Sequence, residues 1–79
     1  VRDLYLTSPE YMRGDDVMTL QLRLLELGYN QVGEADGVFG QMTEDAVRSF
    51  QENNNLTVDG YVGPLTWNKL FSPSAQPNN

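Results

Sequence analysis

The side chains able to support chemistry in this chain are carboxylates, amides and aromatic rings. The sequence contains no histidine and no cysteine, which removes Ser-His-Asp and Cys-His catalysis, the usual general base near neutral pH and the ligands of most zinc sites. Two carboxylates, Asp36 and Asp59, each precede a glycine. Each can either bond to amide or hydroxyl groups of a ligand or cap its own turn. As a catalytic pair they are weak candidates, because nothing in the sequence raises one pKa or fixes their separation.

The two Asp-Gly pairs belong to an internal repeat. Residues 36–43 (DGVFGQMT) recur as residues 59–66 (DGYVGPLT), so each position corresponds to one 23 residues later. In each copy an Asp-Gly turn leads through two apolar residues to a glycine that precedes a helical segment. The repeat therefore predicts two helices that begin from equivalent loops.

Three aromatic residues near these loops are candidates for ligand contact. Aromatic faces stack on sugar rings and peptide groups, and a ring with a polar group suits a wet groove. Tyr29 follows the predicted end of the first helix and is expected at the surface. Tyr61 replaces Val38 of the first repeat with a larger ring, which favours exposure. Trp67 lies at a core-facing position of the third predicted helix, where packing competes with binding.

Two glutamines, Gln21 and Gln51, each follow a core position of a predicted helix. A half-buried amide there can cross-link a loop to the helix, or it can face a groove and bond to a ligand. We predict a groove built on Tyr29, Tyr61 and Gln51 with the two Asp-Gly loops. The full set of candidate ligand-binding residues is Tyr29, Asp36, Phe39, Gln51, Asp59, Tyr61 and Trp67.

Three helical segments must position these residues, and they predict an all-α fold, a compact three-helix bundle with two similar Asp-Gly-x-x-Gly loops. The first helix follows Gly14, with Asp15 as its N-cap. The second starts near Gln41 and frays in residues 52–55, and the third starts at Pro64, whose fixed φ suits the first helical position. The first helix has one apolar stripe at helical spacing, formed by Val17, Leu20, Leu24 and Leu27.

The remaining segments flank a single domain. Residues 1–13 are predicted to be an extended N-terminal arm, residues 14–71 the three-helix domain, and residues 72–79 (SPSAQPNN) a linker or tail without an apolar anchor. A second apolar face of the first helix lies about 145° from the main stripe. Either the arm folds over this face, or the face is an interface with a neighbouring domain or a second copy. The face is formed by Met18, Leu22 and Leu25.

Size and charge exclude several classes of partner. The chain has 79 residues, which allows one domain, and its net charge is −6, with 5 basic residues scattered along the sequence. No basic cluster can neutralise a run of phosphates, so neither nucleic acid nor an anionic membrane surface is expected as a partner. No apolar run approaches the ~20 residues that span a bilayer. The sequence predicts no metal site and no cofactor.

Taken in order, the motifs resemble the peptidoglycan-binding domain 1 family. They are GDDVxxLQxxLxxLGY at residues 14–29, DGxFGxxTxxAVxxFQ at residues 36–51, and LxxDGxVGxxTWxxL at residues 56–70. Each motif alone is weak, but the ordered set is specific, and the match extends from about Leu4 to Phe71. The resemblance implies a three-helix module without catalytic activity, found at one end of secreted bacterial wall-lytic enzymes. Its implied partners are peptidoglycan, through stem peptide or glycan, and a covalently linked catalytic domain, with the module itself a monomer at the cell wall.

Two other hypotheses belong to different functional classes. A packing module would dock on its own enzyme's catalytic domain, or dimerise, through Met18, Leu22 and Leu25. Any catalysis would have to use carboxylates, Tyr or Lys. The third hypothesis is an independent enzyme using carboxylates, and the turn roles open to both Asp-Gly pairs weaken it. The sequence therefore predicts a wall-binding module that is not an enzyme.

Overall fold

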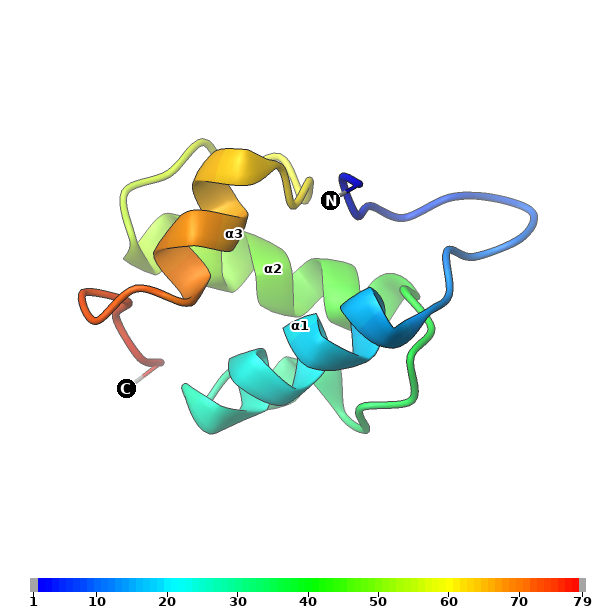
Figure 1. The fold of residues 1–79 in the computed structure, drawn as a ribbon, viewed down its shortest axis with the longest axis horizontal. Coiled ribbons are helices and arrows are strands. Elements are labelled where there is room, and N and C mark those ends of the chain that lie inside the picture. Colours follow the sequence, from blue (N-terminus) through cyan, green and yellow to red (C-terminus); the bar gives the residue numbers. More distant parts are fainter. Residues whose placement is uncertain (1, 79) are drawn as a thin grey trace.

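The computed structural model describes residues 2–78 and contains α1 (Asp15–Glu26), the short 3-10 helix η1 (Asn30–Val32), α2 (Gln41–Asn53) and α3 (Pro64–Leu70) (Figure 1). Over this range no β-strand forms, and the all-α three-helix prediction is confirmed. None of the helices described is long and apolar enough to cross a membrane. The predicted starts of α2 and α3 are correct, whereas η1 had no counterpart in the sequence-based prediction.

The start of α1 corrects one prediction. The N-cap is Gly14, and Asp15 is the first helical residue rather than the cap. The reason is that the Gly14 N–H donates to the Gly37 carbonyl at 3.1 Å, which fixes Gly14 at φ +147°, a conformation that a side chain opposes. Asp16 then occupies the first turn, where its Oδ1 accepts from the Val17 N–H at 2.9 Å.

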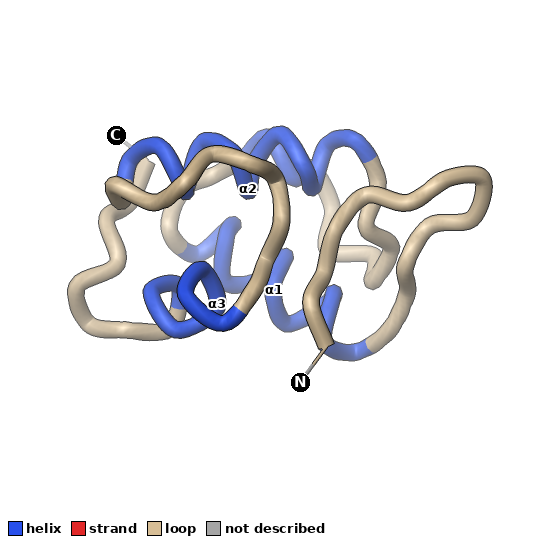
Figure 2. The backbone as a smooth tube through the Cα atoms, turned by 90° about the horizontal axis from the view of Figure 1, so that it is seen from above, coloured by secondary structure: helices blue, strands red, loops and turns tan. Residues whose placement is uncertain are grey.

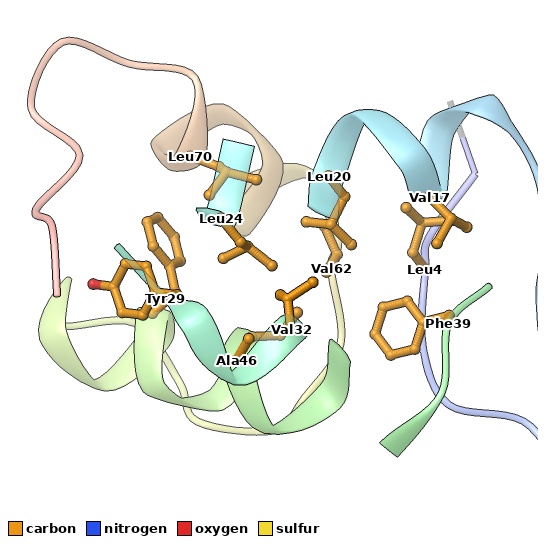
Figure 3. Close-up of a cluster of buried hydrophobic side chains, with 12 residues drawn as sticks. Leu4, Val17, Leu20, Leu24, Tyr29, Val32, Phe39, Ala46, Val62 and Leu70 are labelled. Atoms are coloured by element: carbon orange, nitrogen blue, oxygen red, sulfur yellow. The ribbon is translucent and has the colours of Figure 1, made fainter. Parts of the chain in front are cut away.

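The hydrophobic core joins all of these elements. Side chains of α1, α2 and α3 meet residues of the loops and the arm, so no single helix pair makes the core (Figure 3). Leu4, Val17 and Phe39 gather at one end, and Tyr29 and Leu70 at the other. The complete set of buried apolar residues is Leu4, Val17, Leu20, Leu24, Tyr29, Val32, Phe39, Ala46, Val47, Phe50, Val62 and Leu70.

The N-terminal arm is bound to both Asp-Gly loops. Leu4 exchanges backbone hydrogen bonds with Val62, at 3.1 and 2.7 Å, and the Phe39 N–H donates to the Met12 carbonyl at 2.9 Å. Between these contacts the arm swings out as a long loop (Figure 2). Because Leu4 enters the core, the arm does not cover the second face of α1 at Leu22, which stays 55% exposed.

The C-terminal residues 72–78 also pack on the helices. The Asn78 N–H donates to the Leu27 carbonyl at 2.8 Å, the Gln76 N–H donates to Asn54 Oδ1 at 2.7 Å, and Ala75 packs against the core. The segment therefore has an apolar anchor, which its composition did not indicate. Asn54 is buried at the C-cap of α2, so the expected fraying of residues 52–55 is wrong at that residue. The reason is that the returning tail supplies partners for its side chain.

Candidate ligand-binding grooves

A buried glutamine of α1 fixes the first Asp-Gly loop. The Nε2 group of Gln21 lies 3.0 Å from the Val38 carbonyl, 2.9 Å from Thr43 Oγ1 and 3.2 Å from Asp36 Oδ1. The Oε1 of the same amide accepts from the Gly37 N–H at 2.8 Å. Because the amide has two hydrogens and faces three acceptors, all of its donor capacity is used inside the protein.

A glutamine of α2 does the same for the second loop. Gln51 Nε2 donates to the Tyr61 carbonyl at 2.8 Å, to Asp59 Oδ1 at 2.9 Å and to Thr66 Oγ1 at 3.3 Å. Its Oε1 accepts from the Gly60 N–H at 3.0 Å. Each helix thus holds the loop that starts the next helix, and we call this arrangement the glutamine clamp. The clamp favours the cross-linking role of Gln21 and Gln51.

The two aspartates close their own turns. Asp36 Oδ1 accepts from the Val38 N–H at 3.0 Å, and Asp59 Oδ1 accepts from the Tyr61 N–H at 2.9 Å. The hydrogen bond from the Val38 N–H, followed by the one from the Gln21 amide, lowers the pKa of Asp36 below its usual range. Both residues remain exposed, so each carboxylate supports its turn and still faces solvent.

Two grooves lie beside these loops, one for each repeat. The first groove has a volume of about 460 Å³ and borders the first loop, and the second has a volume of about 370 Å³ and borders the second. Residues that line the first groove include Tyr11, Glu34, Asp36, Val38 and Met42. Residues that line the second include Asp3, Leu56, Asp59, Tyr61, Pro64 and Leu65.

The second groove combines an aromatic surface with carboxylates. Tyr61 is 50% exposed, and its ring stacks on Tyr5 with centroids 4.7 Å apart and planes inclined by 16°. This contact holds the Tyr61 ring in place while leaving half of the residue open to solvent. Asp3 and Asp59 border the same groove, and Leu65 adds an apolar side chain that is 78% exposed. Such a site can stack a sugar ring or a peptide plane and accept hydrogen bonds from its N–H or O–H groups.

The structure separates the predicted site residues into two groups. Asp36, Asp59 and Tyr61 line grooves, but Asp36 lies in the first groove and the other two in the second. Trp67 is half-buried, tilted against Phe71 at 4.8 Å, and lines a smaller hollow of about 190 Å³ next to the second groove. A single groove that uses both loops is therefore not formed.

The other three predicted residues are inaccessible. Tyr29, Phe39 and Gln51 are buried, so none of them can touch a ligand without a rearrangement. The expected surface position of Tyr29 is wrong, because its ring packs edge-on against Phe50 and its hydroxyl donates to the Gln76 carbonyl at 2.8 Å. Phe39 and Gln51 act on the grooves indirectly, through the core and the glutamine clamp.

Sequence reasoning missed the contribution of the arm. Tyr5 supports the second groove, Asp3 lines it, and Tyr11 lines the first groove. It also missed Met42 and Leu65, although they occupy the same position in the two repeats. An apolar residue kept at an exposed repeat position was the signal that could have identified them. Within residues 2–78, no group of three or more acidic side chains is placed to hold a metal ion.

The fold and grooves define a small all-α binding module whose helices carry loops with shallow sites. Residues 13–70 match the family described as "Putative peptidoglycan binding domain". The chain belongs to this family, which confirms the predicted resemblance and the predicted role as a non-catalytic peptidoglycan-binding module.

Individual relatives agree with this assignment. The chain is 41% identical over 75 residues to N-acetylmuramoyl-L-alanine amidase CwlM of Mycobacterium tuberculosis, covering 95% of this chain and 18% of the amidase. It is 52% identical over 58 residues to the spore cortex-lytic enzyme of Halalkalibacterium halodurans, covering 72% of this chain and 17% of that enzyme. The chain therefore spans less than a fifth of the length of these relatives.

A solved structure shows the same fold in an isolated domain. The crystal structure of the SleB N-terminal domain superposes with a TM-score of 0.77 at 39% sequence identity. The superposition covers 87% of this chain and 88% of that one. The fold described here is therefore shared with the SleB N-terminal domain.

Proposed function

We propose that this chain binds peptidoglycan through the second groove and thereby holds an attached wall-lytic enzyme on its substrate. The observation that carries the proposal is the Tyr61 ring, which is supported from behind by Tyr5 and flanked by Asp59 and Asp3. The ring supplies a stacking surface, and the carboxylates accept hydrogen bonds. Peptidoglycan offers both complements, in its sugar rings and in the N–H and O–H groups of its glycan and stem peptides.

The charge of the groove favours one part of the polymer. Among the described residues that line the second groove there is no lysine or arginine, while two carboxylates face it. A carboxylate-rich ligand segment would be repelled, whereas a segment with hydroxyl, amide or amino donors would be attracted. We therefore place the donor-bearing part of the stem peptide or glycan, rather than a free carboxyl terminus, against Asp3 and Asp59.

The mechanism of the module is localisation. Binding to an insoluble substrate raises the effective concentration of any catalytic domain on the same chain, even when the site itself is weak. A shallow site on a domain of this size buries little area, so a modest affinity is expected. The short share of the relatives covered by this chain supports a neighbouring catalytic domain, since their names are those of an amidase and a spore cortex-lytic enzyme. We propose that this module acts at the bacterial cell wall as a secreted monomer.

Co-sedimentation with purified, teichoic-acid-free sacculi tests the proposal. The isolated domain is expected to sediment with the sacculi. Tyr61→Ala is expected to weaken binding by up to about 10-fold, since one stacked ring is worth roughly 0.5–1.5 kcal/mol. Phe71→Ala is the matched control, because Phe71 is also an exposed aromatic residue but lies outside the second groove. Equal binding by both variants would remove the second groove from the site, and no sedimentation of the parent domain would remove the wall-binding role.

An exposed apolar face supports a second candidate function. Leu22 and Phe71 are exposed and line one hollow, of about 440 Å³, between α1 and the end of α3, together with the polar side chains of Thr19, Arg23 and Glu26. Such a face suits packing against a neighbouring catalytic domain or a second copy. Analytical ultracentrifugation of the parent and of Leu22→Glu separates the two functions. A dimer that Leu22→Glu dissociates would favour packing, and a monomer in both cases would favour the wall-binding module.

A further inference from the structure

The two grooves are built from equivalent positions. Within the loops, each lining residue of the second groove corresponds to one 23 residues earlier that lines the first, such as Asp59 with Asp36 and Leu65 with Met42. The same glutamine clamp stands behind each loop. The grooves therefore repeat as complete units, which the sequence repeat alone did not establish.

The arm extends this equivalence to the outer wall of each groove. The Val62 N–H donates to the Leu4 carbonyl, and the corresponding Phe39 N–H donates to the Met12 carbonyl. Leu4 and Met12 thus hold the same place on the two loops, eight residues apart. The residue before each one, Asp3 or Tyr11, lines the adjacent groove.

Each groove has one tyrosine ring and two carboxylates, but the loop and the arm contribute them differently in the two grooves. The second groove has its tyrosine on the loop and a carboxylate on the arm. The first groove has valine on the loop, but Tyr11 on the arm supplies a ring that is 46% exposed, and Glu34 supplies a second carboxylate beside Asp36. Each groove also has one exposed apolar side chain, Met42 at 57% or Leu65 at 78%. Neither lining, within the part of the chain that the structure describes, includes a lysine or an arginine.

From this correspondence we propose that the first groove is a second binding site for the wall polymer, so that one chain binds two segments of it. The occupant is the same donor-bearing glycan or stem-peptide segment proposed for the second groove, and the inference rests on that proposed function. A polymer with a chemical repeat presents identical segments, so two grooves with one set of groups can both be filled. Two carboxylates line each groove, and one arginine lies beside each loop: Arg13 near the Asp36 carboxylate and Arg48, which donates to the Asp59 carbonyl at 3.4 Å. Both grooves therefore have the same charge preference.

With two sites on one chain, the apparent affinity for the polymer should exceed the affinity for a single short fragment. The described chain is 33 Å long in its largest dimension, so both grooves lie within reach of neighbouring segments of one sacculus. Once one groove is occupied, the second binding event is intramolecular, which raises the apparent affinity for polymer by about 100-fold or more over that for a single fragment. A short fragment gains nothing of this kind and fills the two grooves independently.

Titration of the isotope-labelled domain with a soluble disaccharide-peptide fragment of peptidoglycan tests the proposal. We expect amide chemical shifts to move in two regions, residues 33–43 and residues 56–66, with two fragments bound per chain. Tyr11→Ala should remove the first set of shifts and keep the second, and Tyr61→Ala should do the reverse. On sacculi each variant should bind at least about 10-fold more weakly than the parent, and the double variant weaker still.

Matched controls keep the outcomes distinct. Met42→Ala, in the first groove, is paired with Val58→Ala, because both side chains are exposed, at 57% and 45%, and Val58 lines neither groove. If the fragment shifts residues 56–66 alone, and Tyr11→Ala and Met42→Ala bind sacculi like Val58→Ala, the two-site proposal is overturned while the proposed function stands. If only residues 33–43 respond, both the two-site proposal and the placement in the second groove are wrong. If the parent shows no shifts and does not sediment, the proposed function itself fails.

Discussion

The first and second loop units of this chain share one clamp but differ in the segment between helix and loop. Gln21 reaches an aspartate 15 residues later, across Tyr29 and η1, whereas Gln51 reaches one only 8 residues later. Despite that difference, each amide bonds to the turn aspartate, a loop carbonyl, a threonine hydroxyl and the N–H of the turn glycine, and Gln51 Oε1 also accepts from the Asp59 N–H at 3.1 Å. The loop geometry is therefore set by the buried amide and the Asp-Gly turn, and the connecting segment is free to vary.

Removing either clamp should cause the largest loss of stability among these variants. Gln21→Ala or Gln51→Ala leaves a buried glycine N–H, a threonine hydroxyl and a loop carbonyl without their partner, and the free energy of unfolding should fall by about 2–4 kcal/mol. Urea denaturation measures this loss. Gln31→Ala is the control, since Gln31 is exposed and makes one side-chain bond, to Ser49, and should change stability by less than about 0.5 kcal/mol. Gln51 makes one additional bond, from the Asp59 N–H, so only losses that differ by more than about 1.5 kcal/mol would break the equivalence of the units.

Substitution of the turn glycines should give an intermediate effect and sharpen the comparison. Gly37 and Gly60 both have φ +77°, so alanine at either is strained by about 1–2 kcal/mol. A Cβ at Gly37 would meet its nearest neighbour, the Gly14 carbonyl oxygen, at an ordinary 3.5 Å, whereas at Gly60 it would meet the Glu44 side chain at 3.0 Å. The midpoint temperature of thermal unfolding should therefore be lower for Gly60→Ala than for Gly37→Ala. Gly40 has φ −100°, and a Cβ there would meet no atom within 4 Å. The midpoint temperature of Gly40→Ala should therefore be close to that of the parent.

The smallest expected effect is a pH dependence in the first unit. Because the pKa of Asp36 is lowered on folding, its carboxylate adds stability above the pKa of the unfolded chain, and that contribution is lost as the pH falls through the folded pKa. Asp36→Asn should thus flatten the fall in stability below about pH 4. Denaturation midpoints at pH 6 and pH 3 give the measurement. If the difference between the two midpoints is the same in Asp36→Asn and in the parent, Asp36 does not contribute to the loss of stability at low pH.

Much of the fold was predictable because the residues that mark the helix starts lie next to those helices in the sequence. The glycine before Gln41 and the glycine before Pro64 mark helix starts in the sequence, and both helices begin there. The apolar stripe of α1 identified its buried face correctly at Val17, Leu20 and Leu24. These features depend on neighbours within a few residues, which a single sequence displays.

The grooves were only partly predictable, because their walls come from distant segments. Asp59 and Tyr61 were found through the repeat, but nothing local places Asp3 or Tyr11 beside loops many residues away. Tyr29 was misplaced for the same reason: the backbone carbonyl that accepts from its hydroxyl belongs to Gln76, 47 residues later. Burial of a tyrosine depends on such partners, and helix periodicity does not reveal them.

The unequal spans of the two clamps have a kinetic consequence. The bond from Gly37 to Gln21 closes a loop of 16 residues, and the bond from Gly60 to Gln51 closes one of 9. The entropy of closure differs by about 0.5 kcal/mol in favour of the shorter loop. The second unit should therefore form before the first during folding.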